Sequence, residues 1–186
     1  MKFKDKVIYD SNSGILCDVE TGLKLPWYTP SFLIEFVKRD FKGKRIFEWG
    51  CGNSTIWYKA QGAIVEGVDS NKEWAELAGE NIKVETEKQK YIGYINNFDK
   101  FDIIVIDGDP VSYRDDCFHP ALRHIEDDGI IIIDNWEQPA VELSKWPETK
   151  KHIMRNELIL TVYSWPIAGW QTALISKKDA YVNTIV

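Results

Sequence analysis

The stretch RIFEWGCGNSTIWYKAQGAIVEGVD, residues 45–69, decides the fold of this chain. Residues 45–48 are typical of a short buried strand, and a turn with two glycines, residues 49–52, follows them. A helix is expected to begin at Asn53 or Ser54. Glycines let a backbone approach a ligand closely, and the start of a helix offers unpaired N–H groups and a positive dipole end to an anion. The pattern therefore predicts a ligand-binding turn between a strand and a helix.

The end of this stretch is predicted to be a second strand, residues 63–68, which finishes on the carboxylate of Asp69. A carboxylate at the tip of the next parallel strand is well placed to bind both hydroxyls of a ribose. The turn and the carboxylate together predict a nucleoside-cofactor site at the carboxyl edge of a parallel sheet. The dinucleotide fingerprint requires a third glycine, whereas Asn53, Ser54 and Thr55 follow the turn here, which counts against NAD without excluding it.

The run Glu48-x-Gly50-x-Gly52, taken with Asp69, resembles motif I and the acidic second-strand end of class I S-adenosylmethionine-dependent methyltransferases. The resemblance spans about residues 29–176. It implies a three-layer, Rossmann-like α/β fold with a mostly parallel seven-stranded sheet and an antiparallel last strand. It also implies S-adenosylmethionine as cofactor, with its carboxylate at the helix start. The cofactor-binding residues that it implies are Glu48, Gly50, Cys51, Gly52, Asn53, Ser54, Asp69, Ser70, Trp74 and Asp107.

The rest of the chain alternates between predicted strands and helices, as in the sheet of that family. Two runs, residues 101–106 and 130–133, are largely apolar and β-branched, as expected of strands buried on both faces. The other predicted elements, in chain order, are a helix from Pro30 to near Phe41, the helix over 53–60, a helix opened by a capping box at Ser70–Glu73 and running to about Glu80, a weak strand over 82–84, a reduced helix within 85–97, helices over 114–125 and 138–146, and strands over 158–163 and 170–176.

The length of 186 residues predicts one domain, residues 1–186, with an N-terminal arm over 1–28 and a core over 29–176. Trp27 and Tyr28 end the arm just before the helix that covers the cofactor in the resembling family. We therefore expect these two side chains either to contact the site or to pack against the core.

The composition favours a cytoplasmic protein that binds a small molecule. The net charge of −6 argues against a large phosphate-binding face, so no nucleic-acid partner is expected. No apolar run reaches the length of a membrane span, and the Met1 end lacks a signal-peptide pattern. Three scattered cysteines suggest neither a disulfide framework nor a zinc site, and eight tryptophans suggest an aromatic-walled pocket. No feature indicates an oligomeric state.

A second group of polar residues, Asp107, Asp134 and Asn135, follows the two buried strands. Carboxyl ends of parallel strands form the ligand-binding edge of an open α/β sheet, and oxygen side chains there suit a divalent cation such as Mg²⁺. The arrangement resembles the metal triad of catechol-type, metal-dependent O-methyltransferases, in which the cation binds vicinal substrate oxygens. The alternative is that Asp134 and Asn135 only cap the next helix.

The catalytic residues predicted from this resemblance are Asp107 and Asp109. The catechol enzymes carry a lysine base just after the first aspartate, whereas Gly108, Asp109 and Pro110 stand here, so Asp109 is the nearest candidate for a base or a further metal oxygen. His119 is a weaker candidate for the base. Arg114 could clamp a substrate carboxylate, but the interpretation that we favour pairs it with its neighbours Asp115 and Asp116.

The leading functional hypothesis is methyl transfer from S-adenosylmethionine to the oxygen of a small molecule, such as a sugar, a polyol or a catechol-like hydroxyl. Small bacterial methyltransferases that the segment after Asp107 also resembles include enzymes that act on sugars or polyols. Two alternatives come from other classes: an NAD(P)-dependent Rossmann oxidoreductase, and a non-catalytic module that binds a cofactor or a partner.

Overall fold

The computed structural model describes residues 7–10, 15–18, 22–138, 146–165 and 169–177. The strands are β1 (Val7–Asp10), β2 (Ile15–Asp18), β3 (Arg45–Trp49), β4 (Ile64–Asp69), β5 (Ile82–Val84), β6 (Phe101–Ile106), β7 (Ile125–Asp134), β8 (Ile159–Trp165) and β9 (Trp170–Ser176). The helices are α1 (Pro30–Phe36), α2 (Asn53–Ala60), α3 (Lys72–Ala78), α4 (Lys88–Gly93), the 3₁₀ turns η1 (Tyr94–Asn97) and η2 (Val111–Tyr113), α5 (Arg114–His124) and α6 (Pro147–Arg155).

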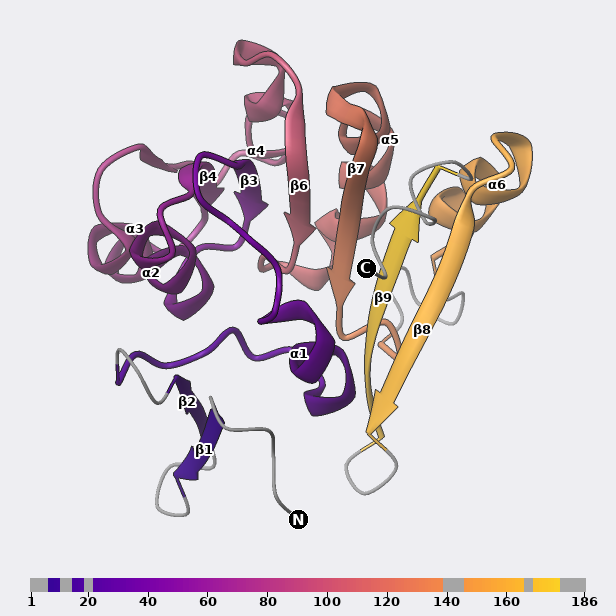
Figure 1. Cartoon of the computed structure of the whole chain (residues 1–186). Coiled ribbons are helices and arrows are strands. Elements are labelled where there is room, and N and C mark those ends of the chain that lie inside the picture. The colour runs from indigo at the N-terminus through magenta and orange to yellow at the C-terminus, as the bar shows by residue number, and fades with distance from the viewer. Residues whose placement is uncertain (1–6, 11–14, 19–21, 139–145, 166–168, 178–186) are drawn as a thin grey trace.

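The main sheet has seven strands in the order β5-β4-β3-β6-β7-β9-β8 (Figure 1). The strands from β5 to β7 are parallel, and β9 runs antiparallel to both of its neighbours. This confirms the predicted mostly parallel seven-stranded sheet with an antiparallel last strand. A separate antiparallel pair, β1 and β2, lies in the N-terminal arm.

The register of the central strands determines where the polar residues meet. Trp49 of β3 lies level with Val68 of β4 and with Ile106 of β6. Ile106 in turn lies level with Ile133 of β7. The glycine turn, Asp69, Asp107 and Asp134 each follow directly after one of these positions, so the backbone brings all of them to one edge of the sheet.

Side chains of the central strands alternate between two cores, one on each face of the sheet. Phe47, Ile104 and Ile131 pack on one face with residues of α4, α5 and the start of α6. Their strand neighbours, such as Ile46 and Ile103, pack on the other face with α1 and α2. Runs of consecutive apolar residues in these strands thus supply both cores, and helices cover both faces, which confirms the predicted three-layer α/β fold.

Two predicted helix boundaries need correction. Helix α1 starts at Pro30 as predicted but ends at Phe36 rather than near Phe41, because the chain leaves the helix and buries the ring of Phe41 against Trp57. Helix α3 is capped by Asn71, whose Oδ1 accepts the N–H groups of Glu73 and Trp74, and not by Ser70. The amide oxygen of Asn71 is one residue nearer to the first turn and takes the hydrogen bonds.

The segment after β7 contains a helix that was not expected from the sequence. Most of the helix predicted over 138–146 falls on residues 139–145, which are outside the described part. Helix α6, which starts at Pro147, was not predicted. Its first N–H groups, on Glu148 and Thr149, are capped from a distance by the buried carboxylate of Asp115 on α5.

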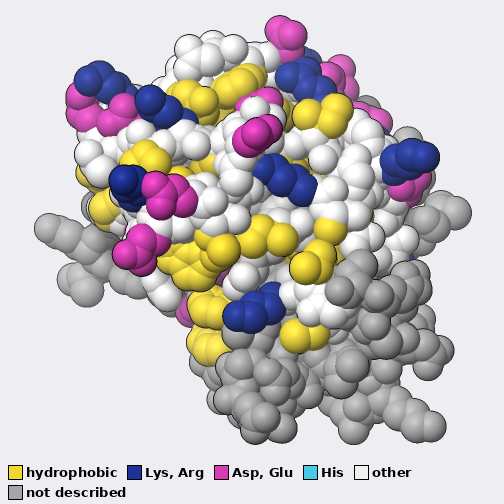
Figure 2. All heavy atoms as spheres, turned by 90° about the vertical axis from the view of Figure 1, so that its left-hand side faces the viewer, with side chains coloured by type: hydrophobic (Ala, Val, Ile, Leu, Met, Phe, Trp, Pro, Cys, Tyr) yellow, Lys and Arg dark blue, Asp and Glu magenta, His cyan; other side chains and the backbone are white. Residues whose placement is uncertain are grey.

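The surface carries charges of both signs. Figure 2 shows one face on which Lys and Arg side chains lie among Asp and Glu, without a continuous basic area. None of the helices in the described segments combines the length and the apolar character needed to cross a membrane.

Candidate active site

The glycine turn after β3 lies against the turn after β6. Gly50 has a φ of +89°, and a Cβ placed on it would come within 2.5 Å of the backbone nitrogen of Gly108. Both the left-handed backbone and the contact exclude a side chain at this position. Gly50 therefore holds the ends of β3 and β6 together, which is what the predicted close-approach turn requires.

Glu48 lies beneath this turn, fully buried, and does not line the cavity described below. Its Oε2 accepts the hydroxyl proton of Thr55 at 2.5 Å, and the same hydroxyl oxygen accepts the N–H of Gly52 at 3.0 Å. Burial raises the pKa of Glu48 to about 7, although hydrogen bonds from Thr55 and Ser54 counteract this. Glu48, predicted as a cofactor contact, thus supports the turn from below.

Asp69 at the end of β4 faces the cavity, as the pattern predicted. One carboxylate oxygen accepts the N–H of Cys51 at 2.7 Å, and the other accepts the N–H of Asn71 at 2.6 Å. Burial raises the pKa of Asp69, the charge of Asp109 adds to this effect, and the two backbone hydrogen bonds oppose it. Cys51 is itself buried, and burial raises the pKa of its thiol well above the ordinary range, so it serves as a small residue in the turn.

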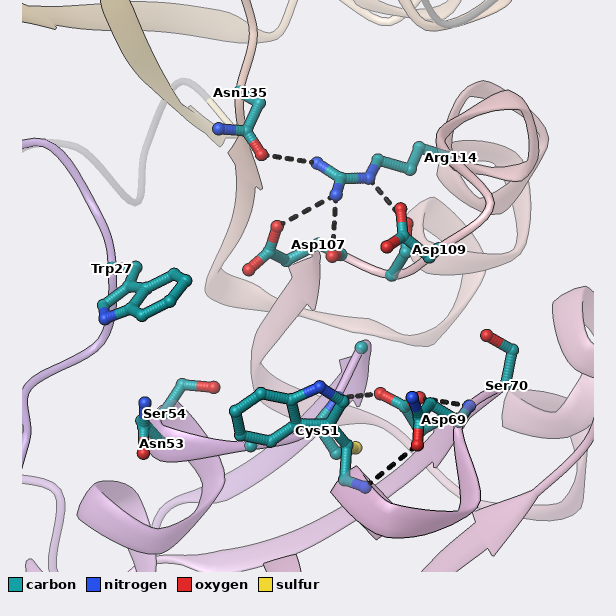
Figure 3. A pocket seen from close by; sticks show the side chains of 15 residues that line it. Trp27, Cys51, Asn53, Ser54, Asp69, Ser70, Asp107, Asp109, Arg114 and Asn135 are labelled. Carbon is teal, nitrogen blue, oxygen red and sulfur yellow. Dashed lines mark hydrogen bonds and ion pairs between the residues drawn. The ribbon is translucent and has the colours of Figure 1, made fainter. Parts of the chain in front are cut away.

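A cavity of about 420 Å³ opens at this edge of the sheet, between the turns after β3, β4, β6 and β7 (Figure 3). Predicted site residues that line it are Gly50, Cys51, Gly52, Asn53, Ser54, Asp69, Ser70, Trp74, Asp107, Asp109 and Asn135. The other lining residues are Trp27, Asn71 and Arg114, for which a contact with the site was one of the alternatives left open by the sequence, and Gly108, which was not considered. His119, the weaker candidate for a base, lies on α5 away from this cavity and stacks on His152.

Two tryptophans form aromatic walls of the cavity. The indole of Trp74 lies across the glycine turn, 3.1 Å from where a Cβ on Gly52 would be, and Trp74 is 41% exposed. Trp27, 62% exposed, lies on the opposite side (Figure 3). Tyr28 instead packs in the core, where its hydroxyl is 3.0 Å from that of Tyr58. Of the two roles that the sequence left open for these arm residues, Trp27 therefore lines the cavity and Tyr28 packs in the core.

Arg114 does not pair with Asp115 or Asp116, so the favoured interpretation of this residue was wrong. Its Nη2 is 3.2 Å from Oδ1 of Asp107, at the end of β6. Its Nη1 donates to Oδ1 of Asn135 at 3.1 Å, beyond the end of β7. Consecutive residues of a helix point in different directions, which explains why Arg114 reaches the sheet edge while its neighbours bind elsewhere.

The predicted metal triad does not fit a divalent cation. Asp107 and Asn135 do meet, but Oδ1 of Asp107 and Oδ1 of Asn135 both contact the guanidinium of Arg114. Asp134 is buried outside the cavity lining, and its Oδ1 accepts the hydroxyl proton of Thr172 at 2.7 Å. Burial, together with the charge of Asp107, raises the pKa of Asp134 well above its ordinary range. Within the described segments, no three His, Cys, Asp or Glu side chains form a metal-binding group.

The cavity carries an excess of negative charge. Asp69, Asp107 and Asp109 line it against the single guanidinium of Arg114. Burial raises the pKa of Asp107 to about 6, Arg114 opposes this, and the charges of Asp109 and Asp69 add to it. Such a site favours a ligand with positive charge and disfavours a pyrophosphate. S-adenosylmethionine, with a sulfonium, an ammonium and one carboxylate, fits these residues, and a dinucleotide fits them poorly.

Comparison with solved structures places this arrangement among known folds. An O-methyltransferase from Bacillus cereus in complex with SAH is 19% identical, covers 82% of this chain and 84% of its own, and has a TM-score of 0.58. A ribosomal protein methylase from Lactobacillus delbrueckii subsp. bulgaricus is 18% identical over 78% of this chain and 76% of its own, with a TM-score of 0.55.

A third similar structure is the MycE methyltransferase from the mycinamycin biosynthetic pathway, in complex with Mg, SAH and mycinamycin VI. It is 13% identical over 82% of this chain and 49% of its own, with a TM-score of 0.56. No protein-family model and no curated protein matches the sequence. Three proteins with different acceptors share the architecture, and this chain has the fold of the class I S-adenosylmethionine-dependent methyltransferases.

Proposed function

We propose that this protein is an S-adenosylmethionine-dependent methyltransferase that methylates a hydroxyl oxygen of a small molecule. The observation that carries the proposal is the cavity in which the close-packed glycine turn and the carboxylate of Asp69 face the same space. The fold shared with methyltransferases supports it, and so does the excess of carboxylates around a cavity that would receive a cationic cofactor.

The cofactor-binding residues would be those of the turn and the neighbouring strand ends. Asp69 would accept hydrogen bonds from the ribose hydroxyls. The N–H groups of the first turn of α2, at Asn53 and Ser54, would bind the carboxylate of the methionine part. Trp74 would cover the cofactor from the side of Gly52, and Glu48 would hold the turn in shape through Thr55.

The bound cofactor would supply an electrophilic methyl group on a sulfonium. Asp107 holds one carboxylate oxygen on Arg114 and turns the other away from it, into the cavity (Figure 3). This second oxygen would accept the proton of the acceptor hydroxyl as the O–CH₃ bond forms and the C–S bond breaks. With a pKa of about 6, Asp107 is mostly ionised above neutral pH and can act as this base. Asp109, more exposed, would orient the acceptor.

The main contribution of the protein to this reaction would be positioning. Transfer from a sulfonium needs little acid catalysis, so the barrier falls chiefly through alignment and removal of water from the nucleophile. Trp27 and Trp74 would exclude water and bind an acceptor with an apolar face. The mixed surface charge and the net charge of −6 support a small molecule rather than a nucleic acid as acceptor.

Isothermal titration calorimetry with S-adenosylhomocysteine tests the proposal. We expect one binding site in the wild type, and a loss of affinity of about 10- to 100-fold in Asp69→Asn, because a hydrogen bond to a charged group contributes about 1.5–3 kcal/mol. Asp99→Asn, which removes an exposed carboxylate away from the cavity, is the matched control and should bind normally.

Titration with NADH separates the oxidoreductase alternative, and we expect no binding because the cavity carboxylates repel a pyrophosphate. Methyl transfer from labelled S-adenosylmethionine to pools of hydroxyl compounds then identifies the acceptor. The proposal would be overturned if the folded wild type does not bind S-adenosylhomocysteine, or if Asp69→Asn binds it as tightly as the wild type does.

A further inference from the structure

The guanidinium of Arg114 lies between the ends of β6 and β7, where it donates four hydrogen bonds and makes one further ion-pair contact. The side chain is 6% exposed. The oxygens that it contacts belong to the backbone and to two side chains. They are the carbonyl of Gly108 at 2.7 Å from Nε, the carbonyl of Asp134 at 3.0 Å and Oδ1 of Asn135 at 3.1 Å from Nη1, and the carbonyl of Asp107 at 2.8 Å and its Oδ1 at 3.2 Å from Nη2.

This set of oxygens has the composition of a cation site. Carbonyl, carboxylate and amide oxygens are the ligands that hard divalent cations take in proteins. A guanidinium is permanently charged and carries five donors in a fixed planar fork, so it can satisfy all five oxygens at once. Since every nitrogen of the guanidinium already contacts oxygens of the protein and the side chain is 6% exposed, a substrate carboxylate would have to displace these contacts, and the clamp considered for Arg114 has no support.

The surrounding structure keeps Arg114 in this position. It is the first residue of α5, and the carboxylate of the next residue, Asp115, is tied to the N-terminus of α6. Asp134 is held on the opposite side by Thr172, whose oxygen also accepts the N–H of Thr29 at 2.9 Å. The carboxylate that would complete a metal triad is thus committed to the junction of β7, β9 and α1.

We infer that Arg114 is a built-in cation, which occupies the place where the predicted triad of Asp107, Asp134 and Asn135 would hold a divalent ion and which fixes Asp107 beside the acceptor. The inference rests on the proposed function for the role of Asp107. It follows that methyl transfer needs no metal ion, and that the acceptor does not have to present two neighbouring oxygens for chelation. Arg114 is a positioning residue, because it acts on the acceptor through Asp107.

Binding of Mn²⁺, followed by electron paramagnetic resonance, tests the inference independently of cofactor binding. The wild type should show no saturable Mn²⁺ site in the cavity. Arg114→Ala frees the five oxygens and should gain a site with a Kd below about 1 mM, the weak end of oxygen-ligand cation sites. Adding Asp107→Asn to Arg114→Ala should remove that gained site. Arg114→Lys keeps a positive charge on a flexible stem and should bind no Mn²⁺.

Two Mn²⁺-binding results would overturn the inference: a wild type with an Mn²⁺ site that Asp107→Asn abolishes, or a folded Arg114→Ala variant that binds no Mn²⁺. If Arg114→Ala fails to fold, the wild-type titration and the Arg114→Lys variant still decide the question. Methyl transfer by the wild type should be unchanged by a chelator, and loss of transfer in chelator would contradict the inference. Calorimetry with S-adenosylhomocysteine reports on the proposed function separately, because its outcome does not depend on Mn²⁺.

Discussion

The two halves of the cavity occupy the same edge of the sheet and are built in opposite ways. Around the turn after β3, Gly50 brings backbone close to the cavity, and Asp69 turns its carboxylate toward it. Around the ends of β6 and β7, the oxygens of Asp107, Gly108 and Asn135 are bound to Arg114. The first half is open to a ligand, and the polar groups of the second half are already hydrogen-bonded within the chain.

This difference assigns the two halves different tasks. An open half with N–H groups and a carboxylate can accept a nucleoside cofactor without rearrangement. The hydrogen-bonded half, at the ends of β6 and β7, offers a rigid surface and the one oxygen of Asp107 that does not contact Arg114. It can therefore orient an acceptor but cannot chelate it. Changes in the first half should therefore alter the turn and cofactor binding, whereas changes behind the second half should alter stability alone.

The largest effect is expected from Gly50→Ala. Its Cβ would meet the backbone of Gly108, which has no flexible end that could move aside. Gly43 also has a positive φ, of +73°, but nothing lies within 4 Å of its Cβ position, so Gly43→Ala is the matched control. We expect Gly50→Ala to lower the free energy of unfolding by about 4 kcal/mol, and Gly43→Ala by about 1 kcal/mol. Urea denaturation measures both, and equal losses would show that the two turns are not packed as described.

Glu48, buried beneath the glycine turn, should make the stability of the protein depend on pH, and Glu48→Gln should remove this dependence. A carboxyl whose pKa is raised on folding favours the protonated form, so its contribution to stability falls as pH rises from its ordinary pKa of 4.5 to about 7. That interval corresponds to roughly 3 kcal/mol. Relative to the wild type, Glu48→Gln should therefore gain stability between pH 4.5 and pH 8, as denaturation at several pH values would measure. The exposed Glu80→Gln is the control, and a constant difference across this range would contradict the prediction.

A smaller effect on stability is expected at Asp115, which lies behind the half of the cavity formed by the ends of β6 and β7. This buried carboxylate accepts the N–H groups of Glu148 and Thr149 and the hydroxyl of Thr149. Asp115→Ala should lower the free energy of unfolding by about 1–2 kcal/mol, as the loss of a helix cap does. Asp116→Ala, which breaks only an exposed ion pair with Lys88, should cost less than about 1 kcal/mol.

Both variants should bind S-adenosylhomocysteine as the wild type does. A strong loss of cofactor affinity in a folded Asp115→Ala variant would show that the two halves are coupled, contrary to the comparison above.

The open half could be predicted from sequence because its parts are local. Gly50, the start of α2 and the end of β4 lie within 25 residues of one another, and each follows from turn, helix-start or strand-end chemistry. The alternation of apolar strands with helices agreed with an α/β sheet, and its seven strands with an antiparallel last strand were implied by the resemblance to the methyltransferase family. Two helix boundaries were misplaced, where tertiary packing of Phe41 or the amide of Asn71 decided the boundary, and helix α6 was not predicted.

The hydrogen-bonded half could not be predicted because it depends on the direction in which individual side chains point. Arg114 finds its partners 7 and 21 residues away, on two strand ends, and nothing in its immediate neighbourhood indicates this. Asp134 and Asn135 looked like one pair, yet Asp134 is the last residue of β7 and Asn135 follows it outside the strand. Asn135, with a φ of +52°, turns to Arg114, while Asp134 turns to Thr172.

The most direct test of the central claim is a crystal structure with S-adenosylhomocysteine bound. The account predicts that the ligand lies in the cavity along the turn at Gly50–Ser54, with both ribose hydroxyls hydrogen-bonded to Asp69 and the sulfur facing Asp107. A ligand bound elsewhere, or a ribose that does not contact Asp69, would contradict it.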